Sequence, residues 1–147
     1  MDEKNDRQHE GTASADSKRL RVTIVTADRP LHQGAADCIV LPGVFGQISI
    51  LRNHAPLLTA LEPGEMIVRD GEEETYYAVS GGFAEVRDNQ VIVLADAAER
   101  GEDVQVAHAE SAERRARLLV RGYRGRPEFA AADRALRYSC ARLKSAQ

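Results

Sequence analysis

Between Leu20 and about Asp96, short segments of alternating apolar and polar residues are separated by turn-forming pairs. The first, LRVTIVT, puts Leu20, Val22 and Ile24 on one side and polar neighbours on the other, the two-residue period of a half-buried strand. Six further segments rich in β-branched residues follow: DCIVL, QISIL, EMIVR, TYYAV, FAEVR and QVIVL. The turn pairs between them are Pro42-Gly43, Pro63-Gly64, Asp70-Gly71, Gly81-Gly82 and Asp88-Asn89. Strands spaced by roughly 8 to 12 residues predict an antiparallel β-sandwich or barrel over residues 20–98.

After Asp96 the apolar period lengthens to three and four residues, the spacing of one helix face. The first run has five members: Ala109, Ala112, Ala116, Leu119 and Tyr123. The segment GYRGRP, residues 122–127, ends this helix with two glycines and a proline. A second run then follows: Phe129, Ala132, Leu136, Cys140 and Leu143. Residues 99–147 therefore predict a two-helix hairpin, and the fold class is α+β. Residues 1–19 are polar and aperiodic, which predicts a disordered tail.

Charge divides along the same boundary. Residues 20–98 carry 5 basic and 11 acidic side chains, whereas residues 99–147 carry 11 basic and 7 acidic. Two short helices with an alanine-rich seam are marginally stable alone in water and need a surface to lean on. Composition favours a hairpin docked permanently on the acidic sandwich. A hairpin with two docking surfaces of similar energy, and hence a switch, is the alternative.

The composition, 43% hydrophobic and 29% charged, is that of a soluble globular protein. No apolar run reaches the roughly 18 to 20 residues of a membrane span, and the first residues lack the apolar core of a secretory signal. A cytosol-like compartment is therefore expected. There, Cys38 and Cys140 are expected to be free, partly buried thiols on apolar faces.

No constellation of residues supports catalysis or a cofactor. His54 is one of four histidines, and the chain has no HxH, HExxH or CxxC pattern that would hold a metal. Ser80, in AVSGGF, does not fit G-x-S-x-G. Gly81-Gly82 is interpreted as a hairpin turn, and the acidic residues 70–75 as a solvated turn. The basic hairpin lacks the aromatic platform of RNA-binding modules, and the acidic overall balance disfavours nucleic acid. The residues thus predict a non-catalytic interaction protein.

Two long segments carry a resemblance to a known family. NHAPLLTALEPGEM, residues 53–66, resembles the G-H-A-P-L-L-T-x-[LI]-x-P-G segment of the epsilon subunit of F-type ATP synthases. AVSGGFAEVRDNQVIVLADAAERGED, residues 78–103, resembles that family's S-G-G-[FI]-x-E-V-x-x-x-x-V-x-[VI]-L-A-D block, and ADCIVLPG matches the strand and turn ahead of both. The resemblance runs from about Leu20 to Leu143. It implies a sandwich of about ten strands followed by a C-terminal helical hairpin.

The resemblance also implies a role: a rotor subunit, peripheral on the cytoplasmic face of the bacterial plasma membrane. In that family the sandwich holds the gamma subunit and rests on the membrane c-ring, helping to couple ion translocation to ATP synthesis. The hairpin of bacterial members lies on the sandwich or extends along gamma into the catalytic alpha/beta head, where it inhibits ATP hydrolysis. The matching partner-interface residues are Val44, Phe45, Gln47 and His54. The regulatory basic residues of the hairpin are Arg114, Arg115, Arg134, Arg137 and Arg142.

Three departures from the family pattern change these expectations. The ring-facing loop commonly reads G-x-E-G-E-[FL]-G-I, but residues 43–50 read GVFGQISI, so a less polar contact with the ring is expected. Residues 52–54 read RNH where the family has P-G-H, so that turn is expected to differ. Some members bind ATP through [IL]-D-x-x-R-A, for which residues 104–109 are the counterpart. Gln105 and His108 replace the acid and the arginine there, so weak or no ATP binding is expected. The alternative function is a free-standing ligand- or nucleotide-sensing module built on the same sandwich.

Overall fold

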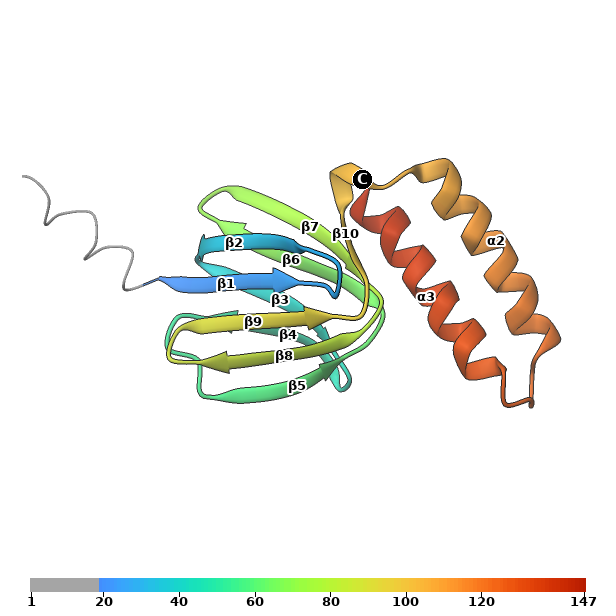
Figure 1. The fold of residues 1–147 in the computed structure, drawn as a ribbon, viewed down its shortest axis with the longest axis horizontal. Helices are drawn as coiled ribbons and strands as arrows, with labels where there is room; N and C mark the ends of the chain where they lie inside the picture. Colours follow the sequence, from blue (N-terminus) through green and yellow to red (C-terminus); the bar gives the residue numbers. More distant parts are fainter. Residues whose placement is uncertain (1–18) are drawn as a thin grey trace, which may run out of the picture.

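A computed structural model describes residues 19–147, so the expected tail lies outside the described residues except for Arg19. Ten strands precede a short 3-10 helix and two α-helices (Figure 1). The strands are β1 (Leu20–Val25), β2 (Pro30–Ala36), β3 (Cys38–Gly43), β4 (Gly46–Leu51), β5 (Leu57–Leu61), β6 (Gly64–Asp70), β7 (Glu73–Val79), β8 (Gly82–Arg87), β9 (Gln90–Ala95) and β10 (Ala98–Arg100). The helices are η1 (Gly101–Asp103), α2 (Val106–Gly122) and α3 (Phe129–Ser145). The predicted sandwich of about ten strands with a C-terminal hairpin is confirmed.

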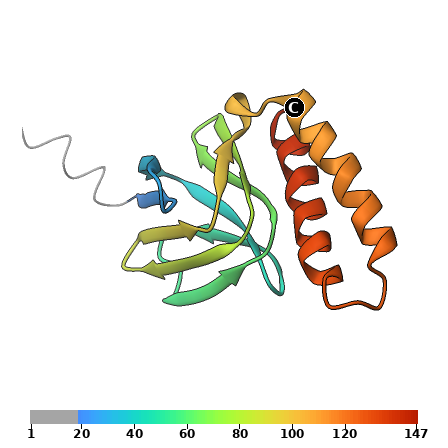
Figure 2. The same cartoon turned by 45° about the vertical axis from the view of Figure 1, so that its right-hand side comes forward.

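The strands form two layers around a common core (Figure 2). One layer runs β10-β7-β6-β3 with β4 beside β3, and the other runs β5-β8-β9-β1-β2. The layers join where Gly43 of β3 pairs with Leu61 of β5. Neighbouring strands pair antiparallel, but β1 pairs with β9 in parallel, from Arg21 opposite Gln90 to Val25 opposite Leu94.

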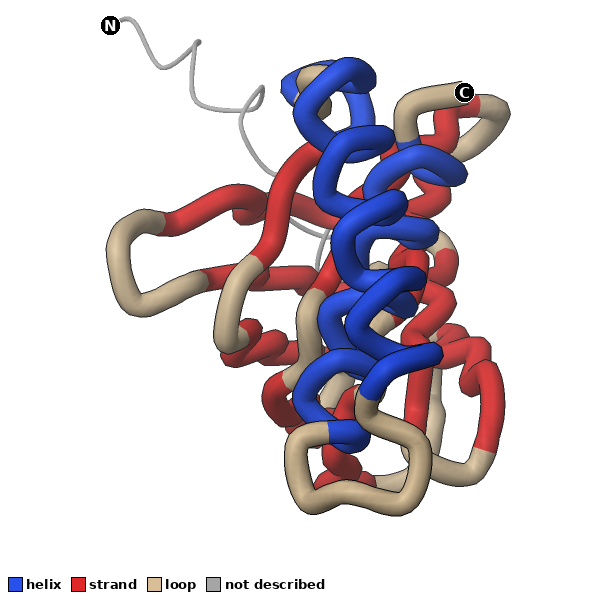
Figure 3. The backbone as a smooth tube through the Cα atoms, turned by 90° about the vertical axis from the view of Figure 1, so that its right-hand side faces the viewer, coloured by secondary structure: helices blue, strands red, loops and turns tan. Residues whose placement is uncertain are grey.

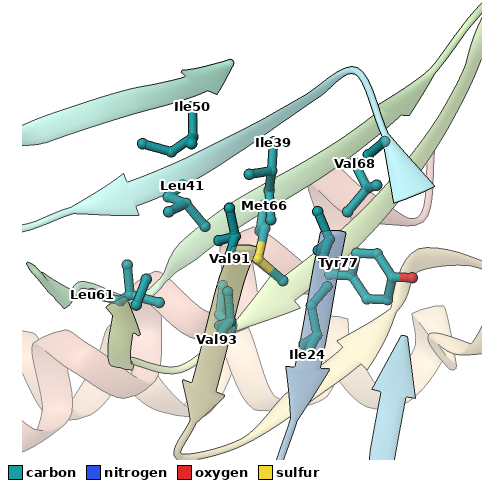
Figure 4. Packing of buried hydrophobic residues seen from close by; sticks show 14 of the residues in the cluster. Ile24, Ile39, Leu41, Ile50, Leu61, Met66, Val68, Tyr77, Val91 and Val93 are labelled. Carbon is teal, nitrogen blue, oxygen red and sulfur yellow. The ribbon is translucent and has the colours of Figure 1, made fainter. Parts of the chain in front are cut away.

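Alternating residues of both layers fill the core. Leu20, Val22 and Ile24 are fully buried, as the two-residue period predicted. Figure 4 shows Ile24 among the other large core side chains, with Tyr77 at one side of the cluster and its hydroxyl directed away from the aliphatic groups. Tyr77 is also fully buried, so this hydroxyl needs partners within the protein.

Two of the predicted turns are hairpins of the expected type. Asp70-Gly71 begins the turn between β6 and β7, and Asp88-Asn89 joins β8 to β9 with both φ angles positive. The interpretation of Gly81-Gly82 as a hairpin turn was wrong. β7 pairs with β6 and β10 while β8 pairs with β5 and β9, so this pair carries the chain from one layer to the other. A Cβ at Gly82 would lie 2.1 Å from the Leu94 carbonyl oxygen, so the glycine is needed for close packing.

The hairpin lies across one side of the sandwich, with α3 between α2 and the strands (Figures 1 and 3). The predicted helix stripes were partly wrong. Cys140 is exposed, and Leu119 is 45% exposed. Because α3 contacts both α2 and the sheet, small residues occupy its closest contacts: Ala132, Ser139, Ala141 and Ser145 are buried. Cys38 is partly buried, as expected, and burial raises the pKa of its thiol.

Candidate interaction surfaces

The β3–β4 hairpin ends in an exposed apolar tip. Gly43 pairs with Gly46, so Val44 and Phe45 are the two turn residues, and the predicted turn at Pro42-Gly43 was two residues early. The reason is Gly46, which has a φ of 120°, whereas Gly43 packs tightly against Ile48 inside the strand pair. Phe45 is 100% exposed and Val44 41% exposed. We call Val44, Phe45 and the exposed Gln47 the apolar tip.

His54 lies at the other end of β4 from the apolar tip. It follows a turn in which Asn53 has a φ of 63° and donates its backbone N–H to Asn89 Oδ1 over 2.7 Å. His54 Nδ1 lies 2.7 Å from the Ala55 carbonyl oxygen, to which it donates. The structure therefore brings Val44, Phe45 and Gln47 together but separates His54 from them by the length of a six-residue strand, roughly 20 Å.

A second apolar surface, absent from the sequence-based candidates, crosses the outer face of the β5-β8-β9-β1 layer. In one row, Ala60 is opposite Phe83, Phe83 opposite Leu94, and Leu94 opposite Val25. Leu58 and Ile92 occupy the next row. Large side chains here are exposed: Leu58 by 72%, Phe83 by 56%, Ile92 by 38% and Leu94 by 56%. We call the six residues Val25, Leu58, Ala60, Phe83, Ile92 and Leu94 the apolar band.

The sequence carried a signal for the apolar band. A strand with one solvent-exposed face alternates apolar and polar residues, but QVIVL and LLTAL have apolar residues at both odd and even positions. Such strands are apolar on both faces. The core covers only the face that bears Val91 and Val93, so the apolar residues of the opposite face are left exposed.

A third surface is the interface between α3 and the sandwich, where acids of the sheet pair with bases of the helix. Glu62 Oε2 lies 2.8 Å from an Arg137 nitrogen and 3.7 Å from one of Arg134. Arg134 also donates to the Ser80 carbonyl oxygen over 3.2 Å. Three of the five predicted regulatory arginines, Arg134, Arg137 and the Arg142 described next, are therefore engaged in docking.

Near the C-terminal end of α3 the pairing is more buried. Arg142 Nε lies 2.7 Å from Glu99 Oε2, and Lys144 Nζ lies 2.9 Å from Glu65 Oε1. The Glu65 side chain is only 6% exposed and also accepts a hydrogen bond from Ser145 Oγ over 3.4 Å. A buried carboxylate without such partners would be strongly destabilising, so Glu65 ties this end of α3 to β6.

The other two predicted regulatory residues, Arg114 and Arg115, lie exposed on α2, away from the sandwich. Arg114 donates to Ser111 Oγ over 3.3 Å. At the start of α2, Gln105 and His108 are both exposed, and Gln105 caps the helix without a side-chain hydrogen bond. The basic side chains of the two helices are therefore divided between docking on α3 and exposure on α2.

Within residues 19–147, no three or more histidine, cysteine or acidic side chains are grouped so that they could hold a metal ion. The helices of this part are too short and too polar to cross a membrane.

Comparison with known proteins identifies this arrangement. The family described as "ATP synthase, Delta/Epsilon chain, beta-sandwich domain" matches residues 19–101. The ATP synthase epsilon chain of Acidithiobacillus ferridurans is 42% identical over 128 residues, which cover 87% of this chain and 91% of the relative. The chain belongs to the ATP synthase epsilon-chain family. The epsilon chain of Moorella thermoacetica is 43% identical over 128 residues, covering 86% of this chain and 96% of that relative.

A likeness in fold to a solved structure extends through the hairpin. A chain in the cryo-EM structure of the Euglena gracilis mitochondrial ATP synthase superposes with a TM-score of 0.71 at 23% identity. The superposition covers 99% of this chain and 90% of the other, so it includes α2 and α3 as well as the sandwich. At this identity, the likeness establishes the fold alone.

Proposed function

We propose that the chain is a non-catalytic central-stalk subunit of an F-type ATP synthase, peripheral on the cytoplasmic face of the bacterial plasma membrane. In this role it helps to couple ion translocation to ATP synthesis. Membership of the epsilon-chain family supports the proposal, and the observation that carries it is the apolar band. A row of apolar side chains across four paired strands, exposed at Phe83 and Leu94 and half-buried at Val25 and Ala60, is typical of an interface rather than of a free surface. We assign this interface to the gamma subunit of the stalk.

The test is co-expression of the chain with its gamma subunit, followed by purification of the complex. A double variant, Phe83→Lys and Leu94→Lys, places two charges in the row and is expected to weaken binding by about 100-fold or more. Leu118→Lys, at a residue 67% exposed on α2, is the control and should leave the complex intact. If the unchanged chain does not bind the gamma subunit but binds a small ligand as a monomer, the alternative of a free-standing sensing module replaces this proposal.

The apolar tip is the proposed contact with the c-ring. Its fully exposed Phe45 and the absence of either family acid favour an apolar contact instead of paired charges. The backbone N–H of Val44 donates to the Ala60 carbonyl oxygen over 3.2 Å, so the tip adjoins the apolar band. The c-ring and the gamma subunit would therefore contact neighbouring parts of one rigid sandwich.

The hairpin is the proposed regulator of ATP hydrolysis. In the docked arrangement, Arg134, Arg137 and Arg142 face the sandwich, whereas Arg114 and Arg115 are exposed and free to meet acidic residues of the catalytic head. In the assembled synthase, neutralising the exposed pair with Arg114→Gln and Arg115→Gln should relieve inhibition of ATP hydrolysis without disturbing docking. Unchanged hydrolysis in this variant, together with unchanged hydrolysis after removal of residues 104–147, would exclude a regulatory hairpin.

ATP binding by the hairpin is proposed to be weak or absent, because Gln105 and His108 offer neither the carboxylate nor the bidentate cation of the family motif. Titration calorimetry of the isolated chain should detect no binding at micromolar ATP. The paired variant Gln105→Asp and His108→Arg restores both groups and is the positive comparison. Micromolar affinity in the unchanged chain would contradict the proposal.

A further inference from the structure

Four polar side chains from four elements meet at the edge of the sandwich where β10 leads into the hairpin. His32 of β2 places Nδ1 3.0 Å from the Tyr77 hydroxyl of β7, with the two rings edge to face at 6.0 Å. Arg100 of β10 lies 5.7 Å over the Tyr77 ring and donates Nη2–H to the same hydroxyl over 3.4 Å. Arg100 Nη1 is paired with Glu102 of η1 at 2.8 Å. We call His32, Tyr77, Arg100 and Glu102 the clasp.

Hydrogen-bond directions in the clasp follow from the donors available. Arginine has only donors, so the Tyr77 oxygen accepts from Arg100 and its own O–H is free to donate to His32 Nδ1. The neutral imidazole then carries its hydrogen on Nε2. Among the described residues His32 Nε2 is buried and has no hydrogen-bond partner. While His32 is neutral, its Nδ1 has a hydrogen-bond partner and its Nε2–H, among the described residues, has none.

Protonation of His32 disturbs this arrangement. With hydrogen on both ring nitrogens, Nδ1 no longer accepts the tyrosine O–H, and a second buried donor is added. The new charge also faces the Arg100 guanidinium. Burial, and then the charge of Arg100, lower the pKa of His32, so the neutral form prevails in the folded protein.

The other charged groups on the surrounding elements are engaged elsewhere and do not compensate a charge on His32. Arg21 is on the outer face of β1, and Tyr76 bonds to Glu74. The remaining groups of β6, β7 and β10 are paired as follows: Glu65 with Lys144, Arg69 with Glu74, Asp70 with Arg19, and Glu99 with Arg142, while Glu73 is exposed at the β6–β7 turn. Glu102, the one acid in the clasp, is already paired with Arg100.

The clasp directly adjoins the backbone against which the last turn of α3 packs. Arg100 is followed by Gly101, and a Cβ built at Gly101 would lie 1.9 Å from the Ser145 carbonyl oxygen. The backbone between Arg100 and Glu102 thus forms the surface on which the last turn of α3 rests. Ser145 is 5% exposed, and its hydroxyl shares Glu65 with Lys144. A shift of Arg100 or Glu102 therefore moves the support of that turn.

We propose that the clasp is a proton-sensitive device, in which protonation of His32 displaces Arg100 and loosens the last turn of α3 from the sandwich. Mild acidification thereby favours release of the hairpin from the C-terminal end of α3. This inference rests on the proposed function only for its consequence, the regulation of hydrolysis; the release itself is a property of the isolated chain.

Nuclear magnetic resonance of the full chain tests the proposal. His32 ring signals give its titration midpoint, expected below about 6.5. Amide exchange of residues 141–146, corrected for the intrinsic effect of pH, should rise about threefold or more between about pH 7.5 and roughly one unit below the measured His32 midpoint. In His32→Asn, whose Oδ1 takes the place of Nδ1 as acceptor for Tyr77, the rise should disappear. His54→Asn, at a histidine outside the clasp, should keep it.

Two outcomes would overturn the proposal: exchange in residues 141–146 that does not follow the His32 midpoint, or the same rise in His32→Asn as in the unchanged chain. Tyr77→Phe provides a second test that keeps the buried ring. It should raise the His32 midpoint towards the free value and abolish its coupling to α3, and an unchanged midpoint would contradict the assigned hydrogen bonds. Because gamma is absent from these measurements, their failure leaves the proposed stalk function untouched.

Discussion

Gly81 and Gly101 lie at the two ends of the α3 interface, where a side chain would collide with the helix. A Cβ at Gly81 would lie 2.6 Å from an Arg134 nitrogen, the mobile end of a long side chain. At Gly101 the obstacle is the Ser145 carbonyl oxygen at 1.9 Å, which is backbone and cannot turn aside. Residue 101 therefore fixes how closely the end of α3 approaches the sandwich, although neither residue contributes a side-chain contact.

Gly101→Ala is predicted to lift the last turn of α3 while leaving the sandwich folded. The collision is expected to destabilise the docked hairpin by about 1–3 kcal/mol. Hydrogen exchange measured by mass spectrometry should show faster exchange in residues 138–147 and unchanged exchange in β1 and β9. Gly122→Ala is the control, because a Cβ there meets nothing within 4 Å. Equal protection of α3 in both variants would show that the close approach is unimportant.

Asp37 is predicted to stabilise the fold above acidic pH. It accepts the Gly71 N–H over 2.7 Å and the Arg19 Nε–H over 3.2 Å, and these partners lower its pKa. A carboxyl whose pKa is lower in the folded state stabilises that state above its unfolded pKa of about 3.9 and loses this effect as pH falls through the folded value. Asp37→Asn should therefore lower the melting temperature at neutral pH, with the difference vanishing below about pH 3. Asp28→Asn, in the exposed β1–β2 connection, is the control for a general charge effect.

At the scale of elements, α3 is the part that joins hairpin to sandwich, and its contacts grow more buried towards its C-terminal end. Glu62 pairs with two arginines that are each more than two-fifths exposed, and such pairs are weak. Glu99 and Arg142 are 23% and 18% exposed, so water screens them less. The docking free energy is therefore expected to concentrate in the last two turns of the helix.

A double-mutant cycle on Glu99 and Arg142 is predicted to give a coupling of about 1–2 kcal/mol in urea unfolding. Each residue would be changed to alanine, alone and together. The matched control is the pair Arg87 and Asp88, which is 75% and 86% exposed and should couple by less than about 0.5 kcal/mol. Similar values in the two cycles would mean that burial of the α3 end does not strengthen its ion pair.

The sequence predicted those elements whose local pattern matches their burial. LRVTIVT became a strand with the expected inward residues, and Asp88-Asn89 became a two-residue turn. The pattern was missing from three strands that are short, contain glycine or lie at an edge: β2, β5 and β10. The position of such a strand is specified by the strand it pairs with, as β1 specifies β2. The helix stripes were misread at Cys140 because contact with two neighbours, and not one, decides which face of α3 is buried. The apolar band required the register of four strands before it could be recognised.

At the scale of the whole molecule, the surfaces proposed for partners are divided between the sandwich and the hairpin. The apolar band and the apolar tip adjoin on the sandwich, whereas the exposed basic residues lie on α2, beyond α3. The apolar surfaces belong to one rigid body held by a continuous core. The basic surface belongs to a hairpin joined to that body by α3 and by the short segment 101–105. A movement of the hairpin therefore need not disturb the contacts proposed with the gamma subunit and the c-ring.

Phe45→Ala is predicted to weaken assembly on the c-ring with little effect on the fold. An aromatic residue that is fully exposed in the free chain and buried in an interface typically contributes about 2 kcal/mol, roughly a 30-fold change in affinity. Because the contact is apolar, raising the salt concentration should leave the difference unchanged. Gln47→Ala is the control at the same hairpin. Binding to the gamma–ring complex that falls steeply with salt would contradict an apolar contact.

The parallel pairing of β1 with β9 delays completion of the sandwich during synthesis. The first strand finds its central neighbour only after about seventy further residues have been made, because Val22 pairs with Val91. Until then, Leu20, Val22 and Ile24 remain uncovered on the nascent chain, with only the β1–β2 hairpin available to them. Once residue 95 is available, the layer can close around this early strand without the hairpin, because α3 contacts β6 and β7 of the other layer.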